Sequence, residues 1–338
     1  MDLETIRRRA QIVSAMRAFF DRQGFVEVET PVRIAAPAPE ANIDCPEVLP
    51  PRNAGGAPTY LRASPELQMK KLLAAGMERI YQIGPCFRDG EKGSRHNPEF
   101  TMMEWYRKGA DYRDILEDAK RLYSFIASIG FSGDGSFETR YSLSADPGTV
   151  LSAQRPYPCR KHENKNINGV HSRFLEMTVR DAYRQWAGWD PWEEWDQDRF
   201  DFDMATKIEP ALKPLGAVFL MDYPPQAASL AKLRGDVAER WEFYVDGIEL
   251  ANCFTELCDP DEQRQRFAVA KDERRRLNEA DYPIDEEFLS VLGDIRSAAG
   301  VALGVDRFVM SILGSRDIAS VRCVDQGSGP RVLGSARK

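Results

Sequence analysis

Two mainly apolar stretches, residues 81–87 and 100–106, lie on either side of a charged loop. The second stretch alternates between two sets of side chains, and the pair predicts two β-strands that form a hairpin. One face of the second strand carries Phe100, Met102, Glu104 and Tyr106. Burial of an unpaired carboxylate on such a face is unfavourable, so we expect a cationic group to contact Glu104.

The loop of this hairpin begins with Arg88 and leads to Phe100 at the start of the return strand. A guanidinium fork and an aromatic ring held near one another suit an anionic, planar ligand such as a nucleotide. A surface hairpin with a solvated loop explains the same pattern equally well.

A second hairpin is predicted for residues 241–257, because Asp246-Gly247 is a strong signal for a two-residue turn. With this turn, Glu242 lies diagonal to Glu249 on one face of the pair, about 7–8 Å apart at the backbone. Two carboxylates together with nucleotide phosphates are suitable oxygen ligands for Mg²⁺. If the face is open to water, the same residues are two solvated glutamates.

The return strand of the second hairpin continues through Asn252, Phe254 and Glu256. A regular strand places Asn252 and Glu256 on the face opposite Glu249. A common site for these residues therefore requires a bulge or bend near residues 251–254.

Helical periodicity predicts amphipathic helices over residues 3–23 and 111–129, each followed by a glycine. Residues 64–76 predict a shorter helix with Glu66 in its first turn. A carboxylate at that position interacts favourably with the helix dipole, which is a sufficient structural reason for its presence.

Residues 300–314 predict a strand that leads into a helix, with Arg307 in the first turn of that helix. A cation there opposes the helix dipole. Such a broken local rule indicates a functional role, and a salt bridge to a nearby acid is the alternative.

Two segments lack useful periodicity. Residues 35–58 are rich in Pro, Ala, Gly and Asn and are predicted to form a loop. Residues 131–173 are predicted to be a surface insertion. The insertion contains Cys159, His162 and His171, whose spacing matches no standard zinc pattern.

Composition narrows the classes of function. The chain has 338 residues and a formal net charge of −7, which argues against a nucleic-acid-binding module and against tRNA as a partner. The six cysteines include no CxxC pair, as expected for reduced thiols. No stretch could span a membrane, and the charged N-terminus does not resemble a signal peptide, so we expect a cytoplasmic protein.

The segment FRDGEKGSRHNPEFTMMEWY resembles motif 2 of the class II aminoacyl-tRNA synthetases in its lysyl-type form. GFVEVETP resembles motif 1, and GVALGVDR resembles motif 3. The resemblance covers residues 5–130 and 175–320 and is strongest to truncated paralogues, the elongation factor P lysyltransferases. It implies an α+β fold, an antiparallel sheet flanked by helices, in one catalytic domain over residues 1–322. Residues 323–338 are predicted to be a disordered tail.

The chemistry that this resemblance implies is adenylate formation from ATP and an amino acid. The residues that it assigns to ATP are Arg88, Glu91, His96, Asn97, Phe100 and Arg307. Arg88 and Arg307 are the expected catalytic residues, because cations would stabilise charge on the phosphate oxygens in the transition state. Glu242 and Glu249 are expected to hold Mg²⁺ against the nucleotide.

The resemblance also implies that the donor is (R)-β-lysine or lysine and that the acceptor is a lysine side chain of elongation factor P. The residues that it assigns to the donor are Glu66, Glu104, Tyr106, Asn252, Phe254, Glu256 and Ala302. Lysyl-tRNA synthetases carry glycine at the position of Ala302, and the extra methyl is expected to favour (R)-β-lysine. Motif 1 implies a homodimer. The chain begins at the motif 1 helix, so we expect no anticodon-binding domain before it.

Two positions depart from the family pattern. Gly90 stands where motif 2 usually carries Glu, with Glu91 one position later, which leaves open the acid that reads adenine. Cys253 replaces the usual Gly after Asn252 and is expected to add bulk beside the pocket.

Two rival functions keep the same fold. One is a free-standing synthetase-like enzyme that activates another amino acid for tRNA or a small acceptor. The other is a non-catalytic paralogue, which is disfavoured because Arg88, Arg307 and the pair Glu242/Glu249 are all present.

Overall fold

The computed structural model describes residues 2–50, 56–131, 137–139 and 173–322. The α-helices in this part of the chain are α1 (Leu3–Asp21), α2 (Glu66–Ala74), α3 (Tyr112–Ala127), α4 (Val179–Ala182), α5 (Gln197–Asp203), α6 (Glu209–Leu212), α7 (Pro260–Arg276), α8 (Glu286–Leu292) and α9 (Val305–Leu313). The strands are β1 (Val26–Glu27), β2 (Arg33–Ile34), β3 (Glu47–Val48), β4 (Thr59–Leu61), β5 (Arg79–Phe87), β6 (Glu99–Lys108), β7 (Ile129–Phe131), β8 (Phe137–Thr139), β9 (Phe174–Thr178), β10 (Ala217–Tyr223), β11 (Leu233–Arg234), β12 (Val237–Val245), β13 (Ile248–Thr255) and β14 (Ala298–Gly304).

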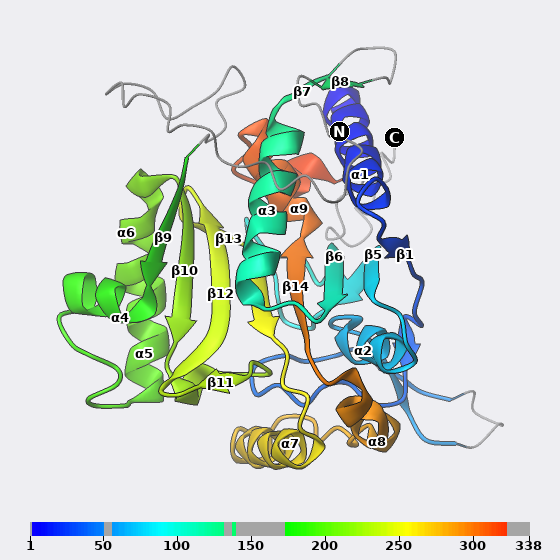
Figure 1. Ribbon diagram of the computed structural model, residues 1–338, viewed down its shortest axis with the longest axis vertical. Helices are drawn as coiled ribbons and strands as arrows, with labels where there is room; N and C mark the ends of the chain where they lie inside the picture. Colours follow the sequence, from blue (N-terminus) through cyan, green and yellow to red (C-terminus); the bar gives the residue numbers. More distant parts are fainter. Residues whose placement is uncertain (1, 51–55, 132–136, 140–172, 323–338) are drawn as a thin grey trace, which may run out of the picture.

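The main sheet has nine strands within the described residues, in the order β1-β5-β6-β14-β13-β12-β10-β9 with β11 beside β12 (Figure 1). From β5 to β10 the neighbouring strands are antiparallel. At the two edges, β1 pairs in parallel with β5, and β9 pairs in parallel with β10. The predicted α+β fold with an antiparallel sheet is confirmed, and parallel pairs are added at its edges.

Both predicted hairpins are present. In the first, Cys86 of β5 pairs with Phe100 of β6. In the second, Asp246 and Gly247 join β12 to β13 with φ of 50° and 76°. These left-handed angles match the twist of the flanking strands, which is why an Asp-Gly pair is favoured in this turn.

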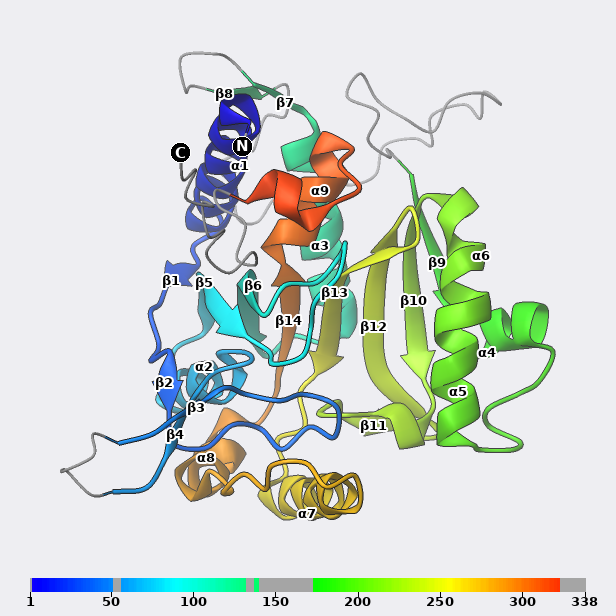
Figure 2. The ribbon, with the colours of Figure 1, turned by 180° about the vertical axis from the view of Figure 1, so that it is seen from behind.

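One face of the main sheet packs against α1, α3 and α9 in the largest hydrophobic cluster, which includes Met103 and Trp105 of β6. Figure 1 shows α3 in front of this face, and Figure 2 shows the opposite face, with the β5–β6 hairpin near the viewer. Because Met103 and Trp105 point into the cluster, Glu104 between them points to the opposite face, as the alternation predicted.

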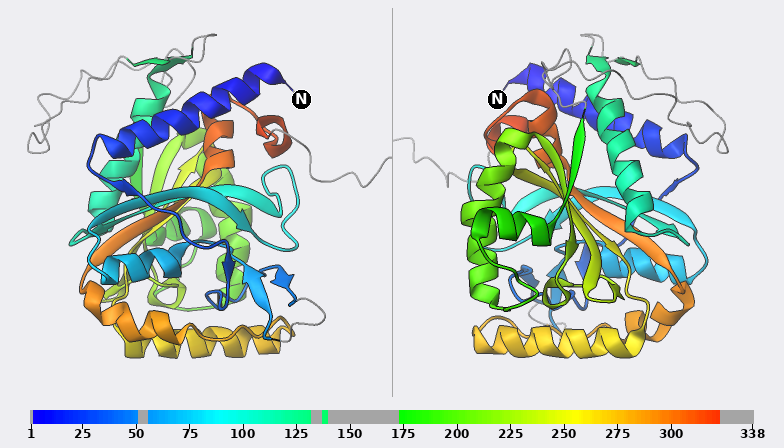
Figure 3. Two further views of the ribbon diagram at one scale, coloured as in Figure 1. Left: turned by 90° about the vertical axis from the view of Figure 1, so that its right-hand side faces the viewer. Right: turned by 60° about the vertical axis from the view of Figure 1, so that its left-hand side comes forward.

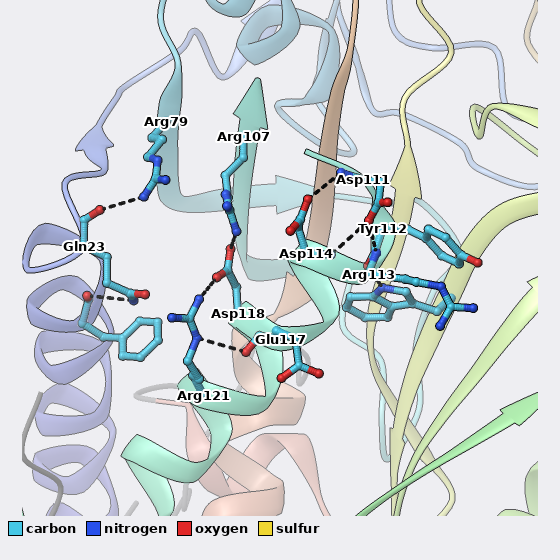
Figure 4. A network of polar contacts seen from close by, with 12 residues as sticks. Gln23, Arg79, Arg107, Asp111, Tyr112, Arg113, Asp114, Glu117, Asp118 and Arg121 are labelled. Atoms are coloured by element: carbon cyan, nitrogen blue, oxygen red, sulfur yellow. Dashed lines mark hydrogen bonds and ion pairs between the residues drawn. The ribbon is translucent and has the colours of Figure 1, made fainter. Parts of the chain in front are cut away.

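A buried carboxylate holds α3 beside β6 (Figure 4). Asp118 of α3 accepts a hydrogen bond from Arg107 of β6 at 3.0 Å and also pairs with Arg121. Burial raises the pKa of the Asp118 carboxyl, and the two guanidinium groups oppose that shift. The start of α3 is fixed by a capping box between Asp111 and Asp114.

Among three smaller hydrophobic clusters of the described residues, two pack against the main sheet. The first lies between α2, α7 and α8 and includes Leu73, Phe267 and Phe288. Figure 3 shows how these helices are arranged. The second lies beside β9 and β10 and contains the buried Trp189 with partly buried tryptophans of the segment around residues 186–195. Four tryptophans in ten residues therefore build a satellite core rather than a ligand site.

The structure tests only some of the predictions about segments without regular periodicity. The segment predicted as loop at residues 35–58 contains β3, which pairs with β4, so that prediction is wrong at this short strand. Most of the insertion at residues 131–173, with Cys159, His162 and His171, lies outside the described residues, as does the tail. In the part of the chain that the structure describes, no helix has the length and hydrophobicity to cross a membrane.

Candidate active site

A cavity of about 270 Å³ opens on the face of the main sheet that is opposite α3. All but one of the residues that the sequence assigned to a site line it: Glu66, Arg88, Glu91, His96, Asn97, Phe100, Glu104, Tyr106, Glu249, Asn252, Phe254, Glu256, Ala302 and Arg307. The exception is Glu242, which is buried beside the cavity. Residues from both hairpins, α2 and the β14–α9 segment thus converge on one space.

A bulge at Leu250 makes this convergence possible. Tyr244 pairs with Glu249 and Phe243 pairs with Ala251, so Leu250 has no partner on β12. The extra residue brings Asn252, Phe254 and Glu256 to the face of Glu249. The bend that the sequence required is present, immediately before the expected range.

Four site residues lie side by side across neighbouring strands. Glu242 of β12 pairs with Asn252 of β13, and Asn252 pairs with Ala302 of β14. Ala302 in turn pairs with Glu104 of β6. Adjacent strands are about 4.8 Å apart, so the Ala302 methyl stands directly between an amide and a carboxylate.

The cavity has two chemically different ends. Arg307 follows the carboxyl end of β14, and Arg88 lies at the hairpin end of β5. Glu256 lies at the opposite end, where its N–H donates to the carbonyl of Ala298 at 2.9 Å. The cavity therefore has a cationic end, near Arg88 and Arg307, and an acidic end, near Glu256.

At the cationic end, the Arg88 guanidinium lies 5.3 Å from the centre of the Phe100 ring and 3.5 Å from the Glu91 carboxylate. Its buried Nε has no hydrogen-bond partner among the described residues. Gly90 has φ of 79°, a left-handed angle that favours glycine. The chain turns at Gly90, and the next residue, Glu91, lines the cavity beside Arg88.

Arg307 is held against the β12–β13 hairpin. Its Nη1 lies 3.3 Å from the Glu249 carboxylate, and its Nε donates to the carbonyl of Arg95 at 3.1 Å. Burial lowers the pKa of His96, and the charge of Arg307 lowers it further, so His96 is a neutral imidazole at neutral pH. Arg95 also lines the cavity, which adds a cation that the sequence did not assign to the site.

The charge of Glu242 acts on the carboxyl group of Glu249. Burial raises the pKa of Glu249, the charge of Glu242 raises it further, and Arg307 opposes this shift. Glu242 accepts hydrogen bonds from Arg240 at 2.5 Å and from Tyr244 at 2.6 Å. Glu242 is therefore not a solvated glutamate, and two nearby carboxylates are oxygen donors of the kind that a Mg²⁺ site uses.

At the acidic end, Tyr106 donates its phenolic proton to Glu104 at 2.8 Å. The second carboxylate oxygen of Glu104 is buried without a hydrogen-bond partner among the described residues. Among the described residues, Glu104 is therefore hydrogen-bonded to the Tyr106 hydroxyl and not to the cationic group that the sequence led us to expect. Burial, followed by the charge of Glu66, raises the pKa of Glu104 to about 8, so the carboxyl is largely protonated near neutral pH.

A buried lysine that the sequence did not assign to the site completes the acidic end. Lys70 Nζ lies 2.5 Å from Glu66 and 2.5 Å from Glu256. Burial alone lowers the pKa of Lys70, but the two carboxylates outweigh it and raise that pKa, so the ammonium stays charged. The spacing of Glu66 and Lys70, four residues apart on a helix, was a visible signal. Only the structure shows that Lys70, rather than Lys71, points into the protein.

Gly300 lies in the same part of the cavity. A Cβ atom added at this glycine would lie 2.1 Å from the Tyr106 ring and 2.9 Å from Glu256. A side chain therefore cannot be accommodated unless the ring moves.

Cys253 does not add bulk beside the pocket, so that prediction is wrong. It pairs with Trp241 and Val301 and is buried in the hydrophobic cluster on the opposite face of the sheet. Adjacent residues of a strand point to opposite faces, and Asn252 occupies the cavity side.

The sequence model of the protein family "tRNA synthetases class II (D, K and N)" matches residues 3–324 of this chain. The chain belongs to this family. Membership in the class II synthetases implies an ATP-dependent amino-acid ligase, which agrees with a cavity that is cationic at one end and acidic at the other.

Curated relatives match nearly the whole chain. A protein of Proteus mirabilis (strain HI4320) named "Elongation factor P--(R)-beta-lysine ligase" is 35% identical over 323 residues, which are 93% of this chain and 92% of the relative. A protein of the same name from Vibrio cholerae serotype O1 is 33% identical over 328 residues, 94% of each chain. One from Haemophilus influenzae (strain PittGG) is 32% identical over 333 residues, 95% of this chain and 94% of the relative.

Proposed function

We propose that this class II synthetase relative activates (R)-β-lysine, or lysine, as an adenylate and transfers the acyl group to a lysine side chain of elongation factor P. The names of the relatives support both the donor and the acceptor. The observation that carries the proposal is the arrangement of one cavity with Arg88 and Arg307 at one end and Glu104 and Glu256 at the other. A molecule with phosphates at one end and amino groups at the other is complementary to it.

In the first step, a carboxylate oxygen of the donor attacks the α-phosphorus of ATP, the bond to the bridging oxygen breaks, and pyrophosphate leaves. Arg88 and Arg307 would stabilise the charge that grows on the phosphate oxygens. The Phe100 ring would stack on adenine, with Glu91 and the neutral His96 available as hydrogen-bond partners for the nucleotide. No protein nucleophile is needed for this step.

In the second step, the neutral amine of the acceptor lysine attacks the acyl carbonyl carbon, AMP leaves, and the amine loses a proton. The chain's own residues hold the donor during this transfer. Glu104, with Tyr106, would bind an amino group of the donor, and Asn252 and Phe254 would line its path. Glu256 and Glu66 would contribute negative charge that is partly neutralised by Lys70.

Glu242 and Glu249 would hold Mg²⁺ against the nucleotide, and the ion would supply further neutralisation of the phosphate charge. Arg307, which lies 3.3 Å from the Glu249 carboxylate, would add its positive charge at the same end of the cavity.

Ala302 is proposed to select the donor. Its methyl lies between Asn252 and Glu104 on the cavity side of the sheet, where it reduces the space available to the donor. We also propose a homodimer formed through the motif 1 segment, because Val26 on the edge strand β1 is 51% exposed. Sedimentation of the purified protein tests that assembly.

ATP–pyrophosphate exchange with (R)-β-lysine, α-lysine and a panel of other amino acids tests the proposed activation step. We expect exchange to be strongest with (R)-β-lysine, followed by labelling of elongation factor P when that protein is added. Exchange with an unrelated amino acid would contradict the donor, and exchange without labelling of elongation factor P would contradict the acceptor.

A further inference from the structure

Glu40 brings an additional carboxylate to the cavity. It lies in the segment between β2 and β3, far in sequence from the two hairpins and from α2. It nevertheless lines the same space as Glu66 and Glu104. Its carboxylate makes no ion pair with any residue that the structure describes, whereas Glu66 pairs with Lys70.

The backbone around Glu40 is held in place by a buried arginine of α7. Arg274 donates to the carbonyl of Glu40 at 2.7 Å and to that of Ile43 at 2.9 Å, and it forms an ion pair with Asp44 at 2.5 Å. The hydroxyl of Tyr282 accepts a hydrogen bond from the N–H of Cys45 at 2.7 Å. These contacts fix the direction from which Glu40 reaches the cavity.

The carboxyl groups of the acidic end are not all paired with a cation among the described residues. Glu40, Glu66, Glu104 and Glu256 are the carboxylates of this end, and the ammonium of Lys70 is shared by two of them, Glu66 and Glu256. Glu40 and Glu104 therefore lack a cationic partner among the described residues. A donor with two amino groups supplies one cation for each of them.

Glu40 and Glu104 differ in their position along the cavity. Burial and the charge of Glu66 raise the pKa of Glu40, and the charge of Arg88 at the cationic end is the first to oppose that shift. Burial and the charge of Glu66 also raise the pKa of Glu104. The hydrogen bond from Tyr106 is the first to oppose that shift, followed by the charge of Lys70. The segment of Glu40 is also tied to the cationic end by geometry, because the N–H of Asp89, next to Arg88, donates to the carbonyl of Asp44 at 2.8 Å. Glu40 thus lies nearer to the phosphate end, where the donor carboxyl reacts.

We propose that Glu40 binds the amino group that lies nearest to the reacting carboxyl of the donor, and that the terminal amino group is left to Glu104. This specificity-determining role rests on the proposed lysine-type activation. It explains why a segment outside the three family motifs is held so firmly over the cavity.

The test compares the Glu40→Gln variant with wild type in donor-dependent pyrophosphate exchange. Two probes are used: (R)-β-lysine, which has both amino groups, and 6-aminohexanoate as a competitor, which has only the terminal one. We expect Glu40→Gln to raise the KM for (R)-β-lysine by about 10-fold to 100-fold, the worth of a charge-assisted hydrogen bond. The inhibition constant of 6-aminohexanoate and the KM for ATP should change by less than about twofold.

Glu47→Gln is the matched control, because it removes the same charge from exposed β3, close in sequence but outside the cavity. Equal effects of Glu40→Gln on both probes, or no effect on either, would overturn the assignment while the proposed function stands. A wild-type protein that supports no exchange with any lysine isomer would overturn the proposed function and this assignment with it. Because the two probes are compared within one variant, partial misfolding cannot imitate the expected result.

Discussion

The ammonium of Lys70 lies 2.5 Å from the carboxylate of Glu256, and both side chains are buried. Replacement of Lys70 by Met would leave Glu256 and Glu66 without their shared cation. We expect the free energy of unfolding to fall by about 3–5 kcal/mol, as when one partner of a buried ion pair is removed. Urea denaturation measures this loss. Lys71→Met is the control, since its ion pairs are partly exposed and should contribute about 1 kcal/mol or less.

Gly300→Ala should impair donor binding without affecting ATP. The added methyl would lie 2.1 Å from the Tyr106 ring and would displace the hydroxyl that donates to Glu104. We expect the KM for the donor to rise by about tenfold or more, in line with loss of a hydrogen bond to a charged group. Gly293→Ala, outside the cavity, meets nothing within 4 Å and should behave as wild type. Comparable defects in the two variants would contradict the role given to Tyr106.

Donor binding should release a proton. The pKa of Glu104 is about 8 without ligand, and a cationic amine requires the ionised carboxylate, so affinity should increase as the pH rises from about 6 to 8. Calorimetry in buffers with different ionisation enthalpies measures the released proton. Glu104→Gln should abolish this release, and a release that is unchanged in that variant would assign it to another group.

The same pKa predicts how the stability of the free protein depends on pH. The folded-state pKa of Glu104 lies above its ordinary value of 4.5, so between these values the folded protein binds more protons than the unfolded chain. The contribution of Glu104 to the free energy of unfolding is therefore fully present below about pH 4.5 and is lost as the pH rises through about 8. Urea denaturation of wild type and Glu104→Gln across this range should show a smaller fall in the variant.

Arg307→Ala should abolish adenylate formation while the protein remains folded. Arg307 is partly exposed and contacts Glu249 and the carbonyl of Arg95, so its loss disturbs little packing. We expect pyrophosphate exchange to decrease by at least about 10²-fold, as when one preorganised donor to a developing negative charge is removed. An unchanged thermal unfolding midpoint is the control for folding. Retained exchange would contradict the assignment of Arg307 to the phosphates.

Ala302→Gly should shift donor preference towards α-lysine. Asn252, Ala302 and Glu104 lie side by side on neighbouring strands. Removal of the Ala302 methyl enlarges the space between the other two for an amino group of the donor. We expect the ratio of kcat/KM for (R)-β-lysine to that for α-lysine to fall by about tenfold, the usual discrimination from one methyl group. An unchanged ratio would show that the donor is selected elsewhere.

Local patterns in the sequence determined the elements that carry the site. Alternation along residues 100–106 placed Glu104 and Trp105 on opposite faces of β6. Asp246-Gly247 specified the turn between β12 and β13. These features depend on a two-residue period and on the backbone angles of single residues, so they can be read without the rest of the chain. The family resemblance then indicated which of these elements meet, and all of the residues that it assigned to the site except Glu242 line one cavity.

The tertiary structure alone decided how the charges are partnered. Lys70 and Lys71 are neighbours on α2, yet packing turns Lys70 into the core and leaves Lys71 near solvent. Glu40 reaches the cavity because Arg274, more than two hundred positions away, holds its segment in place. The bulge at Leu250 likewise depends on the pairing of two strands. Such long-range contacts follow from the packing of whole elements, which no local period in the sequence records.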